Sequence, residues 1–392
     1  MSEVKNLKKA ADRILKAINP PAGKKKEKII LYGDADLDGV AAVIIVKESI
    51  KNLGGEISAI YFPDRETEGY GISETGLSYL KKFSPTLFIA LDCGIGNFKE
   101  IKLAKKLRFE VIVIDHHQII NKLPEASIVV DPKQKEDKYP FKELATAGIA
   151  LRLSELLLKE RMTENLRQNF LELAALATIA DMMPQKEENQ VIVEKGLTSL
   201  ENSWRPGLKV FFNTEPFKNY GTLKQKVSKI ISILNIRDVE DRLPASFRLL
   251  TSTSFEESKE LIKKLLEKSE ERKEKIKIII QEVEERISRK SEPIIFEGSP
   301  DWDFSLISPV ASNLCQKYQK SIFIFKILEK ESQGTVRVPK EIDSVELMKK
   351  CSKYLLTFGG HALASGFRIK NEYLEQFKEC LNKNYEKSNN LH

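Results

Sequence analysis

The stretch KIILYGDADLDGVAAVIIV, residues 28–46, decides the fold, because it joins a short apolar strand to an apolar helix through an acidic turn. The run at 28–32 has the β-branched composition of a strand buried on both faces of a parallel sheet. Similar runs follow it, separated by amphipathic stretches that predict helices. Strands are predicted at 28–32, 57–62, 86–91, 110–114 and 127–130, with helices at about 38–53, 73–82 and 97–107. This alternation predicts an α/β fold with a doubly wound, mainly parallel sheet, in which ligands bind beyond the carboxyl ends of the strands.

The rest of the chain divides into three regions. Residues 143–250 read as mostly helical, and residues 254–290 contain no Gly or Pro and are dense in Lys and Glu. Regularly spaced apolar residues in that second region predict one or two long amphipathic helices. Strand and helix signals return from 291 to about 385. We therefore predict a first domain over 1–250, a long connecting helix over 251–290 and a smaller α/β domain over 291–392.

The composition is that of a globular protein. The chain has 392 residues, of which 41% are hydrophobic and 31% charged, and this excludes wholesale disorder. Its longest apolar runs, such as 40–46, are far shorter than the ~18 residues of a membrane-spanning helix. No signal-peptide core is present at the N-terminus, so we expect a cytoplasmic protein with no membrane partner. The net charge of +7 permits nucleic-acid binding without indicating it.

The cysteines show no C-x-x-C spacing, which argues against a disulfide framework and against a thiolate zinc site. We expect all of them to be reduced. They are Cys93, Cys315, Cys351 and Cys380.

The acidic turn places Asp34, Asp36 and Asp38 at alternate positions. Three carboxylates so close together repel one another unless cations neutralise them. A calcium loop fits the opening of the string, but its twelfth position is Ile45 rather than Glu, and an apolar helix follows at once. A metal site and a set of helix-capping carboxylates both remain open.

Further acidic and imidazole residues follow other predicted strands. Asp92 comes after the third strand, and Asp115, His116 and His117 come after the fourth, at the same edge of the sheet. Asp181 lies at an apolar helix end, where an ionised carboxylate needs a partner. Capping of a helix is the alternative for Asp92. The combined set is rich in oxygen with one imidazole, a mixture that suits two Mn²⁺ ions, with Mg²⁺ as the weaker alternative. Its members are Asp34, Asp36, Asp92, His116 and Asp181.

The C-terminal region contains the string FGGHALASG at 358–366. Gly359 and Gly360 allow a backbone to approach a ligand closely, and His361 can donate to a phosphate. A glycine-rich turn with an incidental histidine is the alternative. Arg337, in a predicted strand, reads on composition as a surface residue.

Taken in order, these strings resemble the DHH phosphoesterase superfamily, and in particular its RecJ-like single-stranded nucleases. The resemblance spans about residues 28–370. The matching strings are DADLDG (34–39), DCGI (92–95), DHH (115–117), Asp131–Pro132 in the place of the family's Asn-Pro, LATIADMMP (176–184), PVASN (309–313), Arg337 and GGHALASG (359–366).

The resemblance implies a two-lobed enzyme in which a DHH lobe holds two divalent ions and a DHH-associated lobe binds the nucleic-acid strand. By resemblance, Asp34 and Asp36 bind one ion each and Asp92 bridges both. His116 and Asp181 complete the shell of the second ion. Such ions activate a water molecule for in-line attack on a phosphodiester.

The same resemblance assigns supporting or phosphate-contacting roles to Asp38, Asp115 and His117. Arg337 and the 359–361 string are expected to hold the substrate backbone or its terminal phosphate. The implied function is hydrolysis of single-stranded nucleic acid, DNA in preference to RNA, by an exonuclease of DNA repair or replication. A helicase or replication factor is the expected protein partner.

Two rival functions remain open: a DHH oligoribonuclease or nucleotide phosphatase acting on very short substrates, and a non-catalytic helicase accessory scaffold. The sequence also departs from the family, with Asn313 where many relatives carry Arg and Ala35 where many bacterial members carry an aromatic residue. Because the chain ends soon after the glycine string, we expect a short form that resembles the archaeal-type members.

Overall fold

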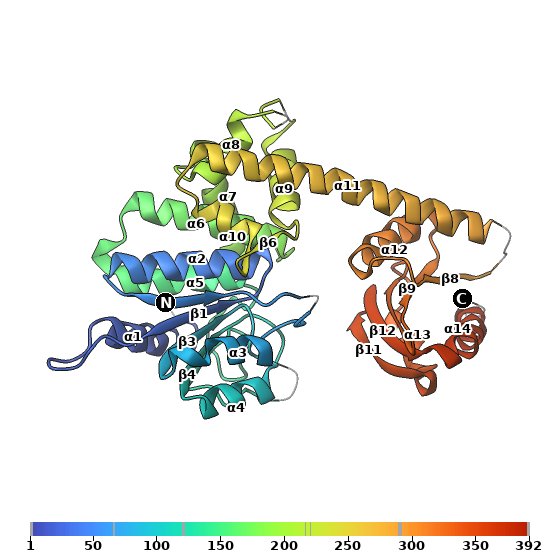
Figure 1. The fold of residues 1–392 in the computed structure, drawn as a ribbon, viewed down its shortest axis with the longest axis horizontal. Coiled ribbons are helices and arrows are strands. Elements are labelled where there is room, and N and C mark those ends of the chain that lie inside the picture. Colours follow the sequence, from blue (N-terminus) through green and yellow to red (C-terminus); the bar gives the residue numbers. More distant parts are fainter. Residues whose placement is uncertain are drawn as a thin grey trace. The chain divides into compact units, whose positions relative to one another are not determined.

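The computed structural model describes residues 3–65, 67–119, 122–215, 217–219, 221–288 and 292–389. The chain forms two compact units, Met1–Leu266 and Glu267–His392. Each unit is built around one five-stranded sheet, and Figure 1 shows both.

The sheet of the first unit is entirely parallel, with strand order β2-β1-β3-β4-β5. All five predicted strands are confirmed, with ends that differ by one residue at most. Strands β1 and β3 are buried along their whole length, which explains their continuous apolar sequences. The strands are β1 (Ile29–Gly33), β2 (Ile57–Tyr61), β3 (Thr86–Leu91), β4 (Phe109–Ile114) and β5 (Ile128–Val130).

Helices cover both faces of this sheet, so the predicted doubly wound arrangement is confirmed (Figure 1). The larger core lies between one face and α1 (Leu7–Ile18), α2 (Leu37–Asn52), α5 (Thr146–Leu158) and α6 (Glu164–Ala180). The smaller core lies on the other face, against α3 (Glu74–Leu80) and α4 (Phe98–Lys106). The sequence analysis predicted α2, α3 and α4 but not α1.

The predicted helical region after the sheet is confirmed, with one small hairpin that was not predicted. The hairpin pairs β6 with β7 in antiparallel register. These elements are α7 (Glu187–Ser199), α8 (Pro206–Asn213), α9 (Leu223–Leu234), β6 (Val239–Glu240), β7 (Leu243–Pro244) and α10 (Ala245–Thr251). Short 3₁₀ helices occur at η1 (Lys81–Phe83), η2 (Lys159–Arg161), η3 (Leu200–Asn202), η4 (Ser352–Tyr354) and η5 (Asn371–Tyr373).

The Lys- and Glu-rich region forms a single helix, α11 (Phe255–Ile287), as its amphipathic pattern predicted. Ile262 and Leu265, near its start, pack into the larger core of the first unit, whereas Ile279 and Val283 pack into a core of the second. The predicted domain boundary between 290 and 291 lies outside the described residues. Among the helices of the described ranges, none combines the length and the apolar character needed to cross a membrane.

The second unit is a smaller α/β domain with a mixed sheet of order β11-β12-β10-β9-β8. Strands β8 and β9 are parallel and the other pairs are antiparallel. Its elements are β8 (Ile294–Ser299), α12 (Phe304–Tyr318), β9 (Ser321–Ile327), β10 (Glu331–Arg337), α13 (Ser344–Lys349), β11 (Leu355–His361), β12 (Ala364–Lys370) and α14 (Leu374–Asn389).

The alternative interpretation of the glycine string as a turn is wrong for its first residues. Gly359 and Gly360 lie in edge strand β11 and pair with Gly366 and Ser365 of β12. Glycine is required at 360, because its φ is +136° and a Cβ there would lie 2.6 Å from the Cα of Ser365.

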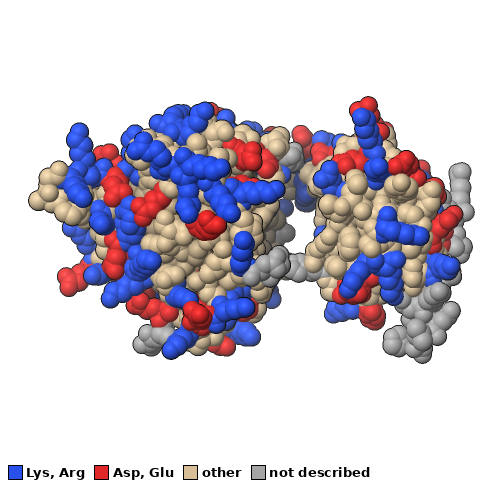
Figure 2. All heavy atoms as spheres, turned by 90° about the horizontal axis from the view of Figure 1, so that it is seen from below, with Lys and Arg blue, Asp and Glu red and all other residues tan. Residues whose placement is uncertain are grey.

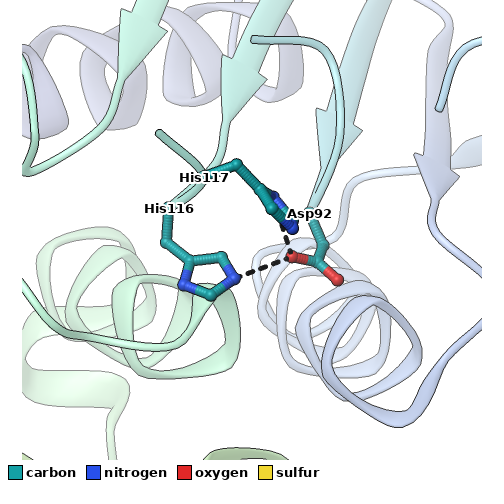
Figure 3. Close-up of side chains that lie close together, drawn as sticks. All are labelled: Asp92, His116 and His117. Carbon is teal, nitrogen blue, oxygen red and sulfur yellow. Dashed lines mark ion pairs between the residues drawn. The ribbon is translucent and has the colours of Figure 1, made fainter. Parts of the chain in front are cut away.

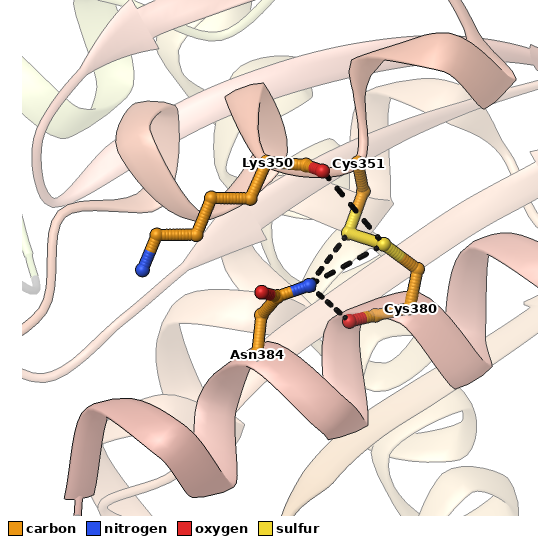
Figure 4. The surroundings of a disulfide bond; sticks show 4 residues. All are labelled: Lys350, Cys351, Cys380 and Asn384. Atoms are coloured by element: carbon orange, nitrogen blue, oxygen red, sulfur yellow. Dashed lines mark hydrogen bonds between the residues drawn. A yellow bond between two sulfur atoms is a disulfide. The ribbon is translucent and has the colours of Figure 1, made fainter.

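The expectation that all cysteines are reduced is wrong for two of them. Cys351 and Cys380 form a disulfide with their Cα atoms 6.0 Å apart, shown in Figure 4. The bond joins the segment after α13 to helix α14, which buries Phe377 and Leu381 in the core of the second unit. Sequence spacing could not reveal the pair, because the two residues meet only when α14 packs against the domain. Cys93 and Cys315 are free, as expected.

The charge of the protein is dispersed. Figure 2 shows lysine and arginine side chains spread over the visible face of each unit and interspersed with acidic residues. The excess of positive charge therefore does not by itself mark a nucleic-acid surface, and the chemistry must be sought in particular side chains.

Candidate metal centre

The carboxyl edge of the first sheet gathers the acidic residues that the sequence singled out. Asp34 directly follows β1, Asp92 follows β3 and Asp115 follows β4. Asp92 adopts a positive φ of 62°, an uncommon conformation for a non-glycine residue. Its amide donates to the carbonyl of Ile114, which ties the ends of β3 and β4 together (2.9 Å).

The start of α2 explains the spacing of the DADLDG string. Asp36 caps the helix, because its Oδ1 accepts from the amides of Asp38 and Gly39, each at 3.1 Å. A side chain at Gly39 would collide with Asp34, since a Cβ there would lie 2.5 Å from the Asp34 carbonyl oxygen. Asp36 therefore caps α2, as the alternative interpretation predicted, and Gly39 is needed for close packing. The cap uses Oδ1 of Asp36, and a role of Asp36 as a metal ligand stays a prediction.

Asp38 is a buried carboxylate held by the N-terminus of α5. Its Oδ2 accepts from the amide of Thr146 (2.7 Å) and its Oδ1 from the amide of Ala147 (2.8 Å). Burial and the charge of Asp36 raise the pKa of Asp38 to about 8, although the two amides oppose this rise. Asp38 thus links α2 to α5, and its supporting or phosphate-contacting role stays a prediction.

A first group of three carboxylates, Asp34, Asp36 and Asp92, offers oxygens that lie within 4.8 Å of one another. The guanidinium of Arg65 lies against this group. Its Nε is 3.1 Å from Asp34 Oδ1, and its Nη2 forms ion pairs with Asp34 Oδ2 and with Asp36 Oδ2, the latter at 2.9 Å. Burial raises the pKa of Asp34, although Arg65 opposes the shift. Arg65 thus supplies positive charge where the carboxylates would otherwise repel one another.

A second group contains His116, Asp38 and Asp181. The Nε2 of His116 lies 3.4 Å from Asp181 Oδ2, 3.5 Å from Asp92 Oδ1 and 3.8 Å from Asp38 Oδ2. Within the described part of the chain, neither ring nitrogen of His116 has a hydrogen-bond partner. Burial, with the charge of His117, lowers the pKa of His116 to about 4, so the imidazole is neutral at physiological pH. A buried, neutral imidazole among three carboxylates has the donor set of a divalent cation site.

Asp92 belongs to two groups, because it also lies with His116 and His117. Figure 3 shows both imidazoles turned toward its carboxylate. Burial and the surrounding carboxylates raise the pKa of Asp92 well above its ordinary value. The position is compatible with a bridging ligand. The resemblance divides Asp34 and Asp36 between two ions, whereas both fall in one group here, so that division stays a prediction.

Asp115 organises the DHH loop. Its Oδ1 accepts from the amides of His116 (2.8 Å) and His117 (3.2 Å) and lies 2.7 Å from His117 Nδ1, while its Oδ2 accepts from the amide of Ile95 (3.0 Å). Burial would raise the pKa of Asp115, but the hydrogen bond and charge of His117 hold it below its ordinary value. Both oxygens are thus engaged in orienting the two histidines.

Three residues of the site were missed by the sequence analysis. Arg65 and Tyr70 come from the loop after β2, and Thr146 donates from its hydroxyl to Asp92 Oδ1 (3.0 Å). The sequence did contain a signal for Arg65 and Tyr70. They follow a predicted parallel strand, and the carboxyl end of that strand lies at the same edge of the sheet as the acidic residues. A cavity of about 300 Å³ beside this edge is lined by Arg65, Asp181 and other residues of the first unit.

The predicted substrate residues other than His117 lie in the second unit. Arg337 donates to hydroxyls of α12, Ser308 at 2.6 Å and Ser312 at 3.1 Å. Gly359 and Gly360 present exposed backbone on β11. The side chain of His361 lies outside what the structure describes, so its predicted phosphate contact stays a prediction.

Comparison with known proteins shows which domain families the chain matches. The family model for the DHH family, N-terminal domain, matches residues 28–178, and that for the DHHA1 domain matches residues 275–387. The chain is 32% identical to the single-stranded-DNA-specific exonuclease RecJ of Bacillus subtilis (strain 168), over 97% of this chain and 48% of that protein. It is 28% identical to the RecJ of Thermus thermophilus, over 96% of this chain and 54% of that protein.

A crystal structure of exonuclease RecJ bound to manganese has the same fold, with a TM-score of 0.78 and 25% identity over 98% of this chain and 95% of that one. The chain spans about half the length of the two curated relatives. The chain therefore shares its fold with that structure and its two domain models with one family. The chain belongs to the DHH superfamily as a RecJ-like member.

Proposed function

We propose that this chain is a RecJ-like exonuclease that hydrolyses single-stranded DNA with two divalent ions, Mn²⁺ in preference to Mg²⁺. The observation that carries the proposal is His116, a buried neutral imidazole whose Nε2 faces three carboxylates within 3.8 Å and has no hydrogen-bond partner among the described residues. The two curated relatives are named single-stranded-DNA-specific exonucleases, and one related structure is bound to manganese.

Two features support the proposal of two ions. Asp34, Asp36 and Asp92 offer oxygens within 4.8 Å of one another, and His116 Nε2 lies 3.5 Å from Asp92 Oδ1 and 3.4 Å from Asp181 Oδ2. Carboxylates with a single imidazole favour Mn²⁺ over a thiolate-bound metal. When bound, such ions supply Lewis-acid polarisation of a phosphate oxygen and lower the pKa of water.

The chain's own residues orient the reacting groups. Asp115 fixes the ring of His117, which is partly exposed, so its other nitrogen can donate to a nonbridging phosphate oxygen. The hydrogen bond to Asp115 raises the pKa of His117 despite burial and so favours the donating form. Arg65, with 44% of its side chain exposed, lies between the first carboxylate group and solvent and can pair with a phosphate.

We assign strand binding to the second unit, through Arg337, the glycine backbone at 359 and 360, and His361. The exposed backbone at Gly359 supports this role, because the space that a Cβ would occupy there is open. The catalytic region over 1–250, the connector over 251–290 and the substrate-binding region over 291–392 remain part of the proposal. DNA in preference to RNA, and a helicase or replication factor as partner, rest on the family resemblance.

The test is digestion of 5′- and 3′-labelled single strands of DNA and RNA, long and very short, by the full chain with Mn²⁺, Mg²⁺ or chelator. Release of nucleotides from long DNA with Mn²⁺ supports the proposal, and release from very short strands alone would support the oligoribonuclease or phosphatase alternative. Asp92→Asn should abolish hydrolysis, and Asp303→Asn, at the start of α12 in the second unit, should not. A folded, manganese-loaded chain without hydrolysis of any strand would instead support the scaffold alternative.

A further inference from the structure

A tyrosine that the proposed mechanism does not use contacts the DHH loop. Tyr70 lies in the loop after β2, and 54% of its surface is exposed although its hydroxyl is hydrogen-bonded. The hydroxyl oxygen is 3.0 Å from His117 Nε2 and 3.2 Å from His117 Nδ1, and it donates to the backbone carbonyl of Asp92 (3.3 Å). The phenol therefore touches both the histidine and the strand end that carries the central carboxylate.

The two nitrogens of His117 have different partners. Nδ1 lies 2.7 Å from Asp115 Oδ1, which accepts its proton, and Nε2 is the nitrogen that remains for a substrate phosphate. The Tyr70 hydroxyl lies at similar distances from both ring nitrogens, so it lies against the ring rather than in line with either N–H, and it donates to the Asp92 carbonyl. The rings meet edge to face, with centroids 5.6 Å apart and planes at 72°. His117 is thus held from two sides.

The loop that presents Tyr70 is itself fixed to the sheet. Glu68 accepts from the hydroxyl of Tyr61 on β2 (2.8 Å), and the hydroxyl of Tyr32 on β1 donates to the carbonyl of Gly71 (3.1 Å). Glycine is required at 71, where φ is +85° and a Cβ would lie 2.5 Å from Asn97 Oδ1. These bonds place Tyr70 through buried strand residues, so its contact with His117 does not depend on a freely moving loop.

We propose that Tyr70 is a positioning residue whose hydroxyl holds the imidazole of His117 in the orientation that meets the substrate phosphate. The inference rests on the proposed function and adds to it a residue that acts through His117. An imidazole fixed on two sides need not reorient as charge develops on the phosphate, and such preorganisation favours the transition state over the bound substrate.

The role predicts a specific kinetic pattern in the full chain. Tyr70→Phe removes only the hydroxyl and should lower kcat about tenfold, the loss of one hydrogen bond, with KM within about twofold. The Mn²⁺ dissociation constant should not change. In a His117→Ala background the same substitution should have no further effect, because Tyr70 then has nothing to position. Tyr79→Phe, at an exposed tyrosine on α3, is the matched control and should behave as the wild type.

A second measurement does not depend on activity. The chain has four histidines, so ¹⁵N-histidine labelling gives few ring signals, and His117→Ala identifies those of His117. Tyr70→Phe should shift the Nε2 signal of His117, and Tyr79→Phe should not.

An unchanged Nε2 signal, or effects of Tyr70→Phe and His117→Ala on turnover that multiply, would overturn the proposal. So would normal turnover by Tyr70→Phe with a raised KM for Tyr70→Leu, which would identify the ring as a contact for a base. If the wild-type chain hydrolyses no strand, the proposed function fails, and the ¹⁵N measurement alone then decides whether the hydroxyl orients His117.

Discussion

Arg65 occupies the face of the carboxylates at which a cation would bind, so replacing it should tighten manganese binding. The guanidinium makes three charge-assisted hydrogen bonds, two to Asp34 and one to Asp36. An incoming ion must compete with all of them for the same oxygens. Arg65→Ala removes the competitor and leaves the carboxylates in place.

The magnitude follows from the exposure of the pair. Buried hydrogen bonds to charged groups contribute about 1.5–3 kcal/mol each, and solvent screening reduces that contribution strongly at the surface. Asp34 is buried, but 44% of the Arg65 side chain is exposed, so we take a total of about 2 kcal/mol for the competition. This corresponds to about thirtyfold tighter binding of the first-group ion.

Isothermal titration of the metal-free chain with Mn²⁺, in the absence of nucleic acid, measures this effect directly. Arg237→Ala is the matched control. Arg237 lines the same cavity as Arg65, but its ion pair is with Asp64, at 2.8 Å. We expect a change of less than about threefold for the control, the size of a screened charge effect. Unchanged or weaker binding by Arg65→Ala, or equal tightening by both variants, would refute the competition.

Three further predictions concern the rest of the chain. His116→Gln should reduce the manganese stoichiometry of the full chain by one ion in the same titration, and an unchanged stoichiometry would remove His116 from the ligand set. Burial raises the pKa of Asp131 to about 7, so its stabilising contribution is complete below its unfolded value near about 4 and is lost as pH rises through 7. Asp131→Asn should therefore gain stability relative to the wild type between pH 4 and pH 8, measured by denaturant unfolding; an equal difference at both pH values would contradict the assignment. The Cys351–Cys380 disulfide closes a loop across a sequence separation of 29, for which loop-closure entropy gives about 3.6 kcal/mol. Reductant should lower the melting temperature of the wild type but not that of Cys380→Ser, and free thiols in the untreated protein would show that the bond is absent in solution.

The sequence predicted the structure best where the local pattern of apolar residues matches their burial in the folded chain. The strands of the first sheet are buried on both faces, and their unbroken apolar runs predict them directly. Acidic residues that follow such strands must share an edge of a parallel sheet, so Asp34, Asp92 and Asp115 could be brought together without coordinates. Helix α11 followed from its periodic apolar residues and its lack of Gly and Pro.

The remaining features depend on contacts between distant parts of the chain. Arg65 and Tyr70 lie in a loop with no periodic pattern. Only the position of β2 beside β1 brings this loop to the edge of the sheet where the candidate metal-binding carboxylates lie. Strand β11 contains two glycines, residues that weaken a strand on propensity, but pairing with β12 overrides that preference. The disulfide between Cys351 and Cys380 requires the packing of α14, which spacing along the chain does not encode.

The carboxylates of the centre differ in the groups that offset their charge. Asp38 is neutralised in part by the amides at the start of α5, Asp115 by the DHH backbone and His117, and Asp34 by Arg65. Each carboxylate that has such a partner can fold without a cation. His116 differs, because no group in the described part of the chain hydrogen-bonds to its ring, and its Nε2 faces Asp92 and Asp181 directly. The negative charge that still needs a cation therefore lies mainly around His116. At the Asp34 group, Arg65 already offsets part of the negative charge. An ion should consequently enter the His116 group with the least competition, and this asymmetry follows from the side chains themselves.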